Sequence, residues 1–310
     1  MLAFLPAPVR AVLALLLFVL NTIFWCTLFY VVLLCKLAVP WTGWRVALSR
    51  ILIRIANAWI DTNDRIMDLT QRIDWDVQGL EGLRRDEWYL VSSNHQSWVD
   101  IVVLQRVLNR RVPFLKFFIK QQLIWVPLLG GVWWGLDFPF MQRHSAAHLA
   151  QHPEDRDRDW ETTRRMCEQF RHIPTAIINF VEGTRFRPDK QARQQSPYRY
   201  LLRPKVGGLA FVLEAMPDRL RTLLDVTLVY PDGPSSFGDL LMGRIRRVIV
   251  RIRALPIPPE LLGGDYRNDP AFRTAIQNWI GQLWVEKDAL IGELRRAAGA
   301  TETVSSAQCP

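Results

Sequence analysis

The stretch WYLVSSNHQSWVDIVVLQRVL, residues 88–108, joins two apolar runs through an abrupt polar turn. The run that opens it reads as a short buried strand, and the run from 97 onward has the spacing of a helix. The turn holds His95 and, five residues later, Asp100. Because open α/β sheets carry their chemistry where strands end, this stretch predicts both a fold class and a candidate site.

The same alternation continues along the chain after residue 71. It predicts an α/β domain with a mixed, largely parallel sheet flanked by helices. The strand RIRRVIVRIRA, 244–254, alternates apolar and Arg residues, so we expect it to be half-exposed or at an edge. The polar segment 187–199 is predicted to be a surface loop. Strands are predicted at 73–78, 88–93, 113–119, 136–141, 175–181, 225–230 and 245–254, and helices at 97–108, 159–171, 206–216 and 270–296.

The N-terminus carries an uncharged apolar run, AVLALLLFVLNTIFWCTLFYVVLLC, from Ala11 to Cys35. As a helix it would be about 37 Å long, more than the roughly 30 Å hydrocarbon core of a bilayer. A signal peptide has a shorter apolar region, about 7–15 residues, so a retained anchor is favoured. The anchor is either one tilted span or a helix pair bent near Asn21. More basic residues follow it than precede it, which predicts that the rest of the chain is cytoplasmic.

The next segment, 41–60, has the pattern of a basic amphipathic helix. Its apolar face carries three Trp residues, and such a helix suits a bilayer surface. The alternative is a helix packed on the core of the domain. The predicted organisation is an anchor with an interfacial helix at 1–62, a catalytic domain at 63–298 and a disordered tail at 299–310.

The chain has 310 residues, a formal charge of +9 and thirteen Trp residues. A positive excess indicates either nucleic acid or an anionic membrane face as partner. The abundant Trp favours the membrane, and no zinc-finger, helix-turn-helix or RNA-binding motif supports nucleic acid. The four Cys residues show no CxxC spacing and no Cys/His cluster, so we expect a reducing compartment and no metal site.

His95 and Asp100 are candidates for acid–base chemistry. A carboxylate on one ring nitrogen fixes the tautomer and raises the basicity of the other nitrogen. The alternative is a structural capping network around Asn94 and Ser97. The spacing alone is weak, since His152 and Asp157 repeat it in a charged segment where we expect solvent exposure.

Further motifs follow in order, and together they resemble the 1-acylglycerol-3-phosphate acyltransferase family in its bacterial, membrane-bound form. Asn94, His95 and Asp100 match the family signature Asn-His-x4-Asp. DFPFMQR, 137–143, resembles the second block, with Asp137 where the family usually has Gly. FVEGTR, 180–185, resembles the third block, with Val181 in place of Pro, and VTLVYP, 226–231, resembles the fourth. Lys120, Pro127 and Gly130 also resemble family positions, as does Lys205 before two glycines.

The resemblance implies roles for these residues. His95 is the general base and Asp100 supports it, while Arg143 and Arg185 grip the acceptor phosphate. The remaining candidates for the substrate site are Glu182, Gly183, Thr184 and Lys205. A Gly at 183 allows close approach of the backbone, and an Arg suits bidentate binding of phosphate.

The implied reaction moves a fatty acyl group from acyl-CoA or acyl-acyl carrier protein to the free hydroxyl of 1-acylglycerol-3-phosphate, with no cofactor. The expected location is the bacterial inner membrane, with the active site facing the cytoplasm. The acceptor could instead be another lysophospholipid, such as lysophosphatidylglycerol. One rival is a hydrolase, but G-x-S-x-G is absent. A second rival, a non-catalytic basic membrane protein, leaves the ordered motifs unexplained.

Overall fold

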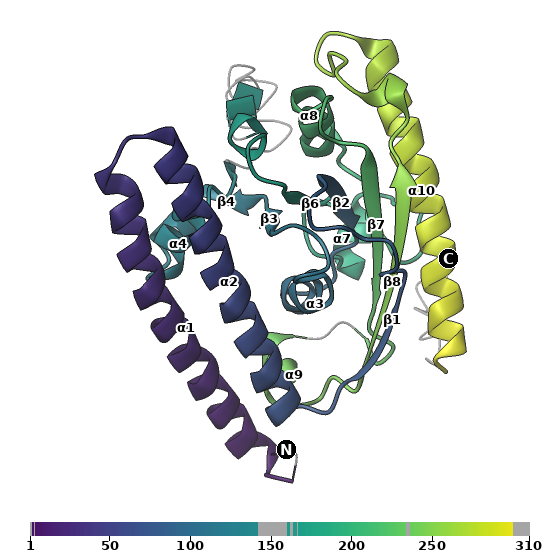
Figure 1. Cartoon of the computed structure of the whole chain (residues 1–310). Coiled ribbons are helices and arrows are strands. Elements are labelled where there is room, and N and C mark those ends of the chain that lie inside the picture. The colour runs from purple at the N-terminus through teal and green to yellow at the C-terminus, as the bar shows by residue number, and fades with distance from the viewer. Residues whose placement is uncertain are drawn as a thin grey trace.

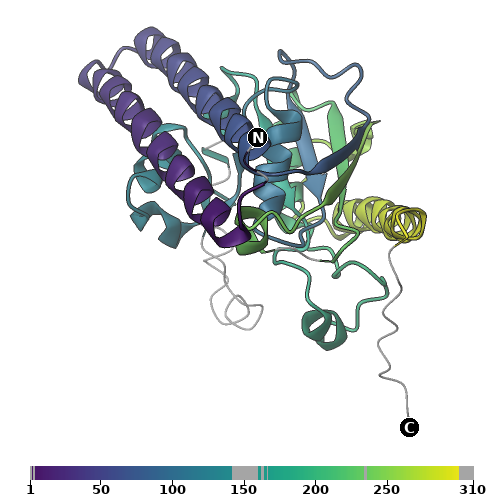
Figure 2. The same cartoon turned by 90° about the horizontal axis from the view of Figure 1, so that it is seen from below.

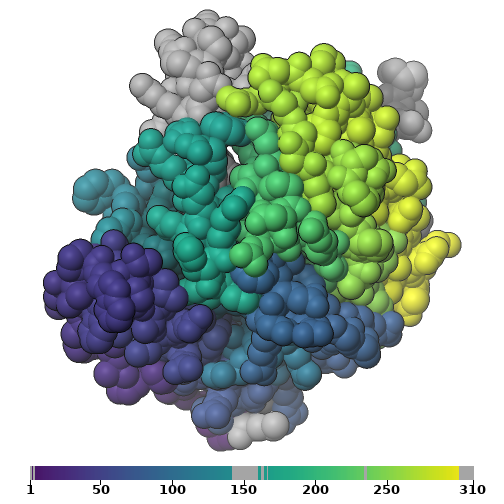
Figure 3. Space-filling model, turned by 45° about the horizontal axis from the view of Figure 1, so that its top comes forward, coloured from purple at the N-terminus to yellow at the C-terminus, as the bar shows by residue number. Residues whose placement is uncertain are grey.

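The computed structural model describes residue 2 and the ranges 4–141, 160–161, 164–165, 167–233 and 236–299. A six-stranded sheet lies at its centre, between an N-terminal helical hairpin and the C-terminal helix (Figure 1). The space-filling view shows the hairpin in purple on one flank and the C-terminal helix in yellow on the opposite flank (Figure 3). The sheet contains β1 (Asp74–Gln78), β2 (Tyr89–Ser93), β3 (Leu115–Phe117), β6 (Ala176–Phe180), β7 (Thr222–Val229) and β8 (Arg247–Pro256).

The strand order is β1-β8-β7-β2-β6-β3, and β7–β8 is the one antiparallel pair among the described strands. The predicted mixed, largely parallel sheet is therefore confirmed. Since β8 lies between β1 and β7, the expectation of an edge strand is wrong, whereas its half-exposed character is confirmed. The Arg side chains of β8 donate hydrogen bonds to carboxylates. For example, the guanidinium of Arg251 donates to Asp76 Oδ1 at 2.8 Å.

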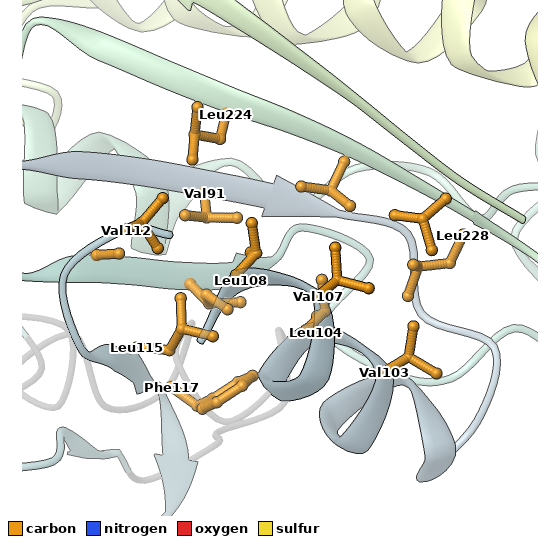
Figure 4. Packing of buried hydrophobic residues seen from close by; sticks show 14 of the residues in the cluster. Val91, Val103, Leu104, Val107, Leu108, Val112, Leu115, Phe117, Leu224 and Leu228 are labelled. Atoms are coloured by element: carbon orange, nitrogen blue, oxygen red, sulfur yellow. The ribbon is translucent and has the colours of Figure 1, made fainter. Parts of the chain in front are cut away.

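Helices cover both faces of the sheet because side chains alternate along each strand. On β2, Tyr89 and Val91 join the apolar cluster beneath α3 (Val99–Leu108), while Leu90 joins the cluster on the other face. Figure 4 shows Leu104 and Leu108 of α3 directed at the strands. The second cluster is closed by α8 (Gly207–Ala215) and α10 (Pro270–Ala297). Fully burying one such side chain contributes about 1.5–3 kcal/mol.

Some predicted elements are shorter or divided. The strand expected at 113–119 splits into β3 and β4 (Ile119–Lys120), and β4 pairs with β5 (Phe140–Met141) apart from the main sheet. The strand expected at 136–141 is reduced to β5 because the backbone turns at Asp137, where φ is +58°. The other described helical elements are η1 (Gln121–Trp125), α4 (Leu129–Gly135), α7 (Pro188–Arg193), α9 (Phe237–Leu241) and η2 (Pro259–Leu261). Since α7 lies within 187–199, that segment is not wholly a loop.

The N-terminal hairpin consists of α1 (Ala7–Ala38) and α2 (Thr42–Thr70), which lie side by side in both cartoon views (Figures 1 and 2). The expected alternative of a bend near Asn21 is wrong, because α1 is continuous there. The Asn21 amide instead donates to Asn63 Oδ1 at 2.8 Å and to the Trp59 carbonyl at 3.2 Å. A polar residue in the apolar run thus joins the two helices, and its amide is satisfied inside the protein.

The helix predicted over 41–60 is confirmed, and the protein covers only part of its apolar face. Leu48 and Leu52 are buried, whereas Trp41, Trp44 and Ile51 are exposed. The buried part packs on the protein, as the alternative expected, and contact of the exposed part with a bilayer surface stays a prediction. Because α2 continues to Thr70, the predicted boundary at residue 62 falls inside it, and the division into domains stays a prediction.

Candidate active site

Three segments far apart in sequence meet where parallel strands end. β2 pairs in parallel with both β6 and β7, so their carboxyl ends share one edge of the sheet. His95 follows β2, the segment 181–185 follows β6, and Tyr230 follows β7. This edge is where open α/β sheets form binding sites.

His95 and Asp100 lie in direct contact. The ring Nδ1 of His95 is 2.8 Å from Asp100 Oδ2, and that oxygen also accepts the backbone N–H groups of Gln96 at 2.6 Å and Ser97 at 2.9 Å. The other oxygen, Oδ1, accepts the Tyr230 hydroxyl at 2.8 Å. Asp100 is 0% exposed, and its two oxygens accept all of these hydrogen bonds. When Nδ1 donates to Asp100, the neutral ring keeps Nε2 as a proton acceptor.

The turn around His95 is fixed from two further directions. The Asn94 side chain donates to the Leu228 carbonyl at 2.9 Å and accepts the Leu228 N–H at 2.8 Å, which ties the turn to β7. The imidazole stacks on Phe180, with ring centroids 4.0 Å apart. The N-cap of α3 is Trp98 and not Ser97, but the Ser97 Oγ still accepts the Val99 N–H at 3.1 Å just before the helix. The capping network and the His–Asp pair therefore coexist.

Glu182 holds the backbone of the site and lies behind it. Its Oε1 accepts the His95 N–H at 2.8 Å, and its Oε2 accepts the Leu202 N–H at 3.0 Å. The side chain is 0% exposed. This burial raises the pKa of Glu182 to about 8, although the two N–H donors favour the carboxylate. The geometry makes Glu182 a positioning residue for the His95 turn.

The turn after Glu182 requires a glycine. Gly183 has φ +67°, and a Cβ at this position would come within 3.2 Å of Lys205 Cδ. The backbone N–H of Lys205 donates to the Val181 carbonyl at 2.6 Å. Lys205 therefore covers Gly183 from outside, and it is not among the residues that line the cavity described below.

Arg185 is positioned by an aromatic ring. Its guanidinium carbon lies 4.9 Å from the centre of the Trp98 ring. An Arg on the surface often serves only to form a salt bridge. Arg185 forms no ion pair with any residue that the structure describes. An exposed guanidinium held over an indole is available to an anion.

Two residues near the site were not anticipated from the sequence. Tyr230 lies in the fourth block, whose resemblance to the family implied no role for this residue. Lys190 of α7 donates through Nζ to Thr184 Oγ1 at 2.6 Å. Burial, followed by the positive charges of Arg187 and Arg185, lowers the pKa of Lys190. Its one sequence signal was its place in the polar segment 187–199. Arg143, like His152, lies outside the described residues.

A cavity of about 750 Å³ opens beside His95. Its polar end carries His95, Thr184 and Arg185, and most of its remaining wall is apolar. The hairpin supplies part of that wall, as do α3 and the segment from η1 to α4. Lining residues include Trp25, Cys26, Phe29, Ile55, Ala56, Trp59, Ile101, Phe117, Lys120, Leu123, Leu129, Val132, Trp133 and Phe138. Such a shape suits a long apolar ligand with a reactive or charged end.

Comparisons with known proteins show what this chain is similar to. A family model described as Acyltransferase matches residues 74–231. The mouse 1-acyl-sn-glycerol-3-phosphate acyltransferase gamma is 27% identical over 185 residues, which cover 56% of this chain and 44% of that protein. The chicken lysocardiolipin acyltransferase 1 is 23% identical over 255 residues, which cover 76% of this chain and 61% of that protein. The chain thus spans about half the length of the first of these relatives and three fifths of the second.

A crystal structure of a 1-acyl-sn-glycerophosphate acyltransferase from Thermotoga maritima aligns with a TM-score of 0.49 and 18% identity, covering 88% of this chain and 97% of that one. The family match takes in half of the present chain, from the start of β1 to the residue after Tyr230. It therefore includes all three segments that meet at His95. On this match, the chain belongs to the acyltransferase family.

Proposed function

We propose that this chain transfers a fatty acyl group from a thioester, acyl-CoA or acyl-acyl carrier protein, to the free hydroxyl of 1-acylglycerol-3-phosphate. The product is phosphatidic acid. The observation that carries the proposal is the placement of His95, oriented by Asp100, in the same cavity wall as Arg185 and a long apolar surface. No cofactor other than the donor substrate enters the proposal.

The reaction is direct transfer. His95 Nε2 takes the proton of the acceptor hydroxyl while the hydroxyl oxygen attacks the thioester carbonyl. A C–O bond forms and the C–S bond breaks, and the proton held by His95 passes to the leaving thiolate sulfur. Asp100 keeps the ring oriented and stabilises the imidazolium. General-base help of this kind typically contributes about 10²–10⁴-fold.

Arg185 supplies the charge that binds the acceptor. Its guanidinium can hold a phosphate through two parallel hydrogen bonds, and Lys190 adds a second cation beside Thr184. Holding the phosphate fixes the hydroxyl near His95, and such positioning can supply much of a rate enhancement. Arg143 is proposed as a further phosphate ligand on the family resemblance alone.

The proposed partner is a bilayer, met by the exposed side of α1. This helix is long and apolar enough to cross a membrane, the one such helix in the described part of the chain. α2 lies along it and carries charged residues such as Arg54 and Asp61. Burying those charges in hydrocarbon would be costly, which supports a hairpin embedded in one leaflet. The proposed location is the cytoplasmic face of a bacterial inner membrane.

A second acceptor class keeps the same chemistry. Val181 and Asp137 depart from the family pattern, and relatives are named for cardiolipin and inositol lipids. A lysophospholipid such as lysophosphatidylglycerol is therefore the alternative acceptor. Purified full-length protein should be assayed with lysophosphatidic acid, lysophosphatidylglycerol and lysophosphatidylinositol, each with acyl-CoA and acyl-acyl carrier protein. Fastest turnover of lysophosphatidic acid supports the proposal, and fastest turnover of another lipid replaces it with the alternative.

A further inference from the structure

A second hollow of about 250 Å³ lies beside the apolar cavity, near the end of the hairpin. Its wall carries Lys36 of α1, Arg45 of α2 and Asp137, together with the exposed Trp134 of α4. Phe138 lines both hollows, so they are neighbours. His95 and Arg185 line only the larger one. The second hollow is therefore not part of the proposed catalytic site.

Positive charge is in excess around this hollow. Lys36 is 6% exposed, and its Nζ donates to the Gly135 carbonyl at 3.1 Å and lies 3.7 Å from Asp137 Oδ2. The guanidinium of Arg45 makes no hydrogen bond or ion pair to any described residue. Lys116 lies in the wall of a smaller, adjoining hollow. Among the described residues that line the two hollows there are thus three cations and one carboxylate, that of Asp137.

Lys116 is buried without an ion-pair partner among the described residues. It is 5% exposed and lines a small hollow of about 20 Å³. This small hollow shares Gly135, Asp137 and Gln169 with the hollow of about 250 Å³. Its Nζ lies 4.1 Å from the centre of the Phe170 ring, and no described carboxylate is within ion-pair distance. A buried ammonium group is costly unless an opposite charge compensates it. Burial lowers the pKa of Lys116 to about 8, in keeping with this cost.

The backbone conformation of Asp137 is unusual for a residue with a side chain. Asp137 has φ +58°, in the left-handed region that favours glycine, and glycine is the residue that the family resemblance leads us to expect there. The side chain that replaces it reaches the buried Lys36. An acidic residue at a strained position thus holds a cation in the wall of the hollow, which glycine could not do.

We propose that this hollow binds the phosphate group of an anionic molecule, in the first place a phospholipid headgroup. Arg45 and Lys36 would contact the phosphate, and Lys116 would add charge behind them. The exposed Trp134 and Leu37 line the hollow, and Trp is the residue that settles at headgroup depth in membranes. A soluble phosphate compound would use the same contacts. The inference does not depend on the proposed reaction.

Detergent-solubilised full-length protein should be titrated with dihexanoyl phosphatidylglycerol and, separately, with inorganic phosphate, and the apparent Kd obtained from the rise in Tm. Neither compound is an acyl acceptor of the proposed reaction, so turnover does not enter the readout. Arg45→Gln should weaken binding about tenfold, as loss of one charged hydrogen-bond partner predicts. Arg50→Gln, an equal charge change on an exposed residue of α2 outside the hollow, is the matched control.

Lys36→Met should weaken binding in the same direction, and Arg185→Ala should leave this Kd unchanged. Stabilisation by the lipid alone identifies a headgroup site, and stabilisation by both compounds identifies a site for phosphate from either source. Both outcomes support the proposal when Arg45→Gln weakens the binding about tenfold and Arg50→Gln does not. Binding that is insensitive to Arg45→Gln, equally weakened by Arg50→Gln, or lost only in Arg185→Ala would overturn it.

Discussion

The Tyr230 hydroxyl donates a 2.8 Å hydrogen bond to Oδ1 of Asp100, the carboxylate oxygen that His95 leaves unused. Tyr230 is fully buried at the end of β7, so the position of Asp100 is set by a different strand from the one that carries His95. Burial and the negative charge of Asp100 raise the pKa of Tyr230 well above its ordinary value. The hydroxyl therefore remains a donor throughout the neutral range.

Tyr230→Phe should lower kcat about tenfold and leave KM nearly unchanged, because it frees Asp100 without touching a substrate. The tenfold fall in kcat is what the loss of one hydrogen bond to a charged group predicts. Tyr89→Phe is the matched control, since that buried hydroxyl bonds Arg84 and Glu87 away from the site. The pH profile of kcat should shift in Tyr230→Phe alone. Equal losses in both variants would mean that the hydroxyl matters only for packing.

Arg185→Ala should raise the acceptor KM by tenfold or more and the thioester KM much less. Arg185→Lys should rescue only part of this, because an ammonium group lacks the planar fork of guanidinium. Arg187→Ala serves as the control, since Arg187 is occupied by Asp189 at 2.8 Å. Steady-state kinetics with each substrate varied in turn make the comparison. Equal changes in the two KM values would count against phosphate binding by Arg185.

Glu182 makes stability depend on pH. Its folded pKa of about 8 lies above the ordinary 4.5, so the folded protein holds this proton more tightly than the unfolded chain. The contribution is complete below about pH 4.5, falls as pH rises toward 8, and levels off above it, with a total of a few kcal/mol. Glu182→Gln should remove this part of the pH dependence of the free energy of unfolding.

Denaturant titrations at pH 5, 7 and 9 would measure that difference between Glu182→Gln and the unmodified protein. Glu286→Gln is a useful comparison, because hydrogen bonds from Arg253 and Gln282 lower the pKa of Glu286. Glu286→Gln should therefore change the pH dependence of the free energy of unfolding in the opposite direction from Glu182→Gln, and at lower pH. A pH dependence that survives unchanged in Glu182→Gln would contradict the assignment.

Val132→Phe should shorten the acyl chains that the protein accepts. Val132 lines the 750 Å³ cavity, so the added ring takes space from a ligand. Activity should fall more with a long acyl donor than with a short one. Val31→Phe places the same bulk on the exposed outer side of α1 and should leave the ratio unchanged. A uniform loss across chain lengths in Val132→Phe would show that this cavity does not hold the acyl chain.

The sequence predicts the site best where a motif and the end of a strand coincide. The alternation of strands and helices placed His95 and the 182–185 segment at one edge of the sheet, and their contacts follow from parallel pairing. Tyr230 escaped notice because its partner, Asp100, lies 130 residues away and no local pattern marks the contact. Lys190 was missed although Thr184 is close in sequence, because the contact depends on the way α7 folds back onto Thr184.

The hairpin shows a different limit. An amphipathic pattern records that one face avoids water, and it does not distinguish a bilayer from a protein core. The apolar face of α2 therefore suggested a membrane surface, whereas Leu48 and Leu52 pack within the protein. Asn21 similarly suggested a bend, because its partner Asn63 on α2 could not be read from α1 alone.

The most direct test of the central claim is the turnover of purified His95→Ala with lysophosphatidic acid and an acyl thioester, followed by mass spectrometry of the lipid product. The protein should remain folded, and kcat should fall by about 10²–10⁴-fold, because His95 moves the proton in the transfer step. His172→Ala, at an exposed position outside the cavity, should behave like the unmodified protein. Near-normal turnover by a folded His95→Ala protein would contradict the account.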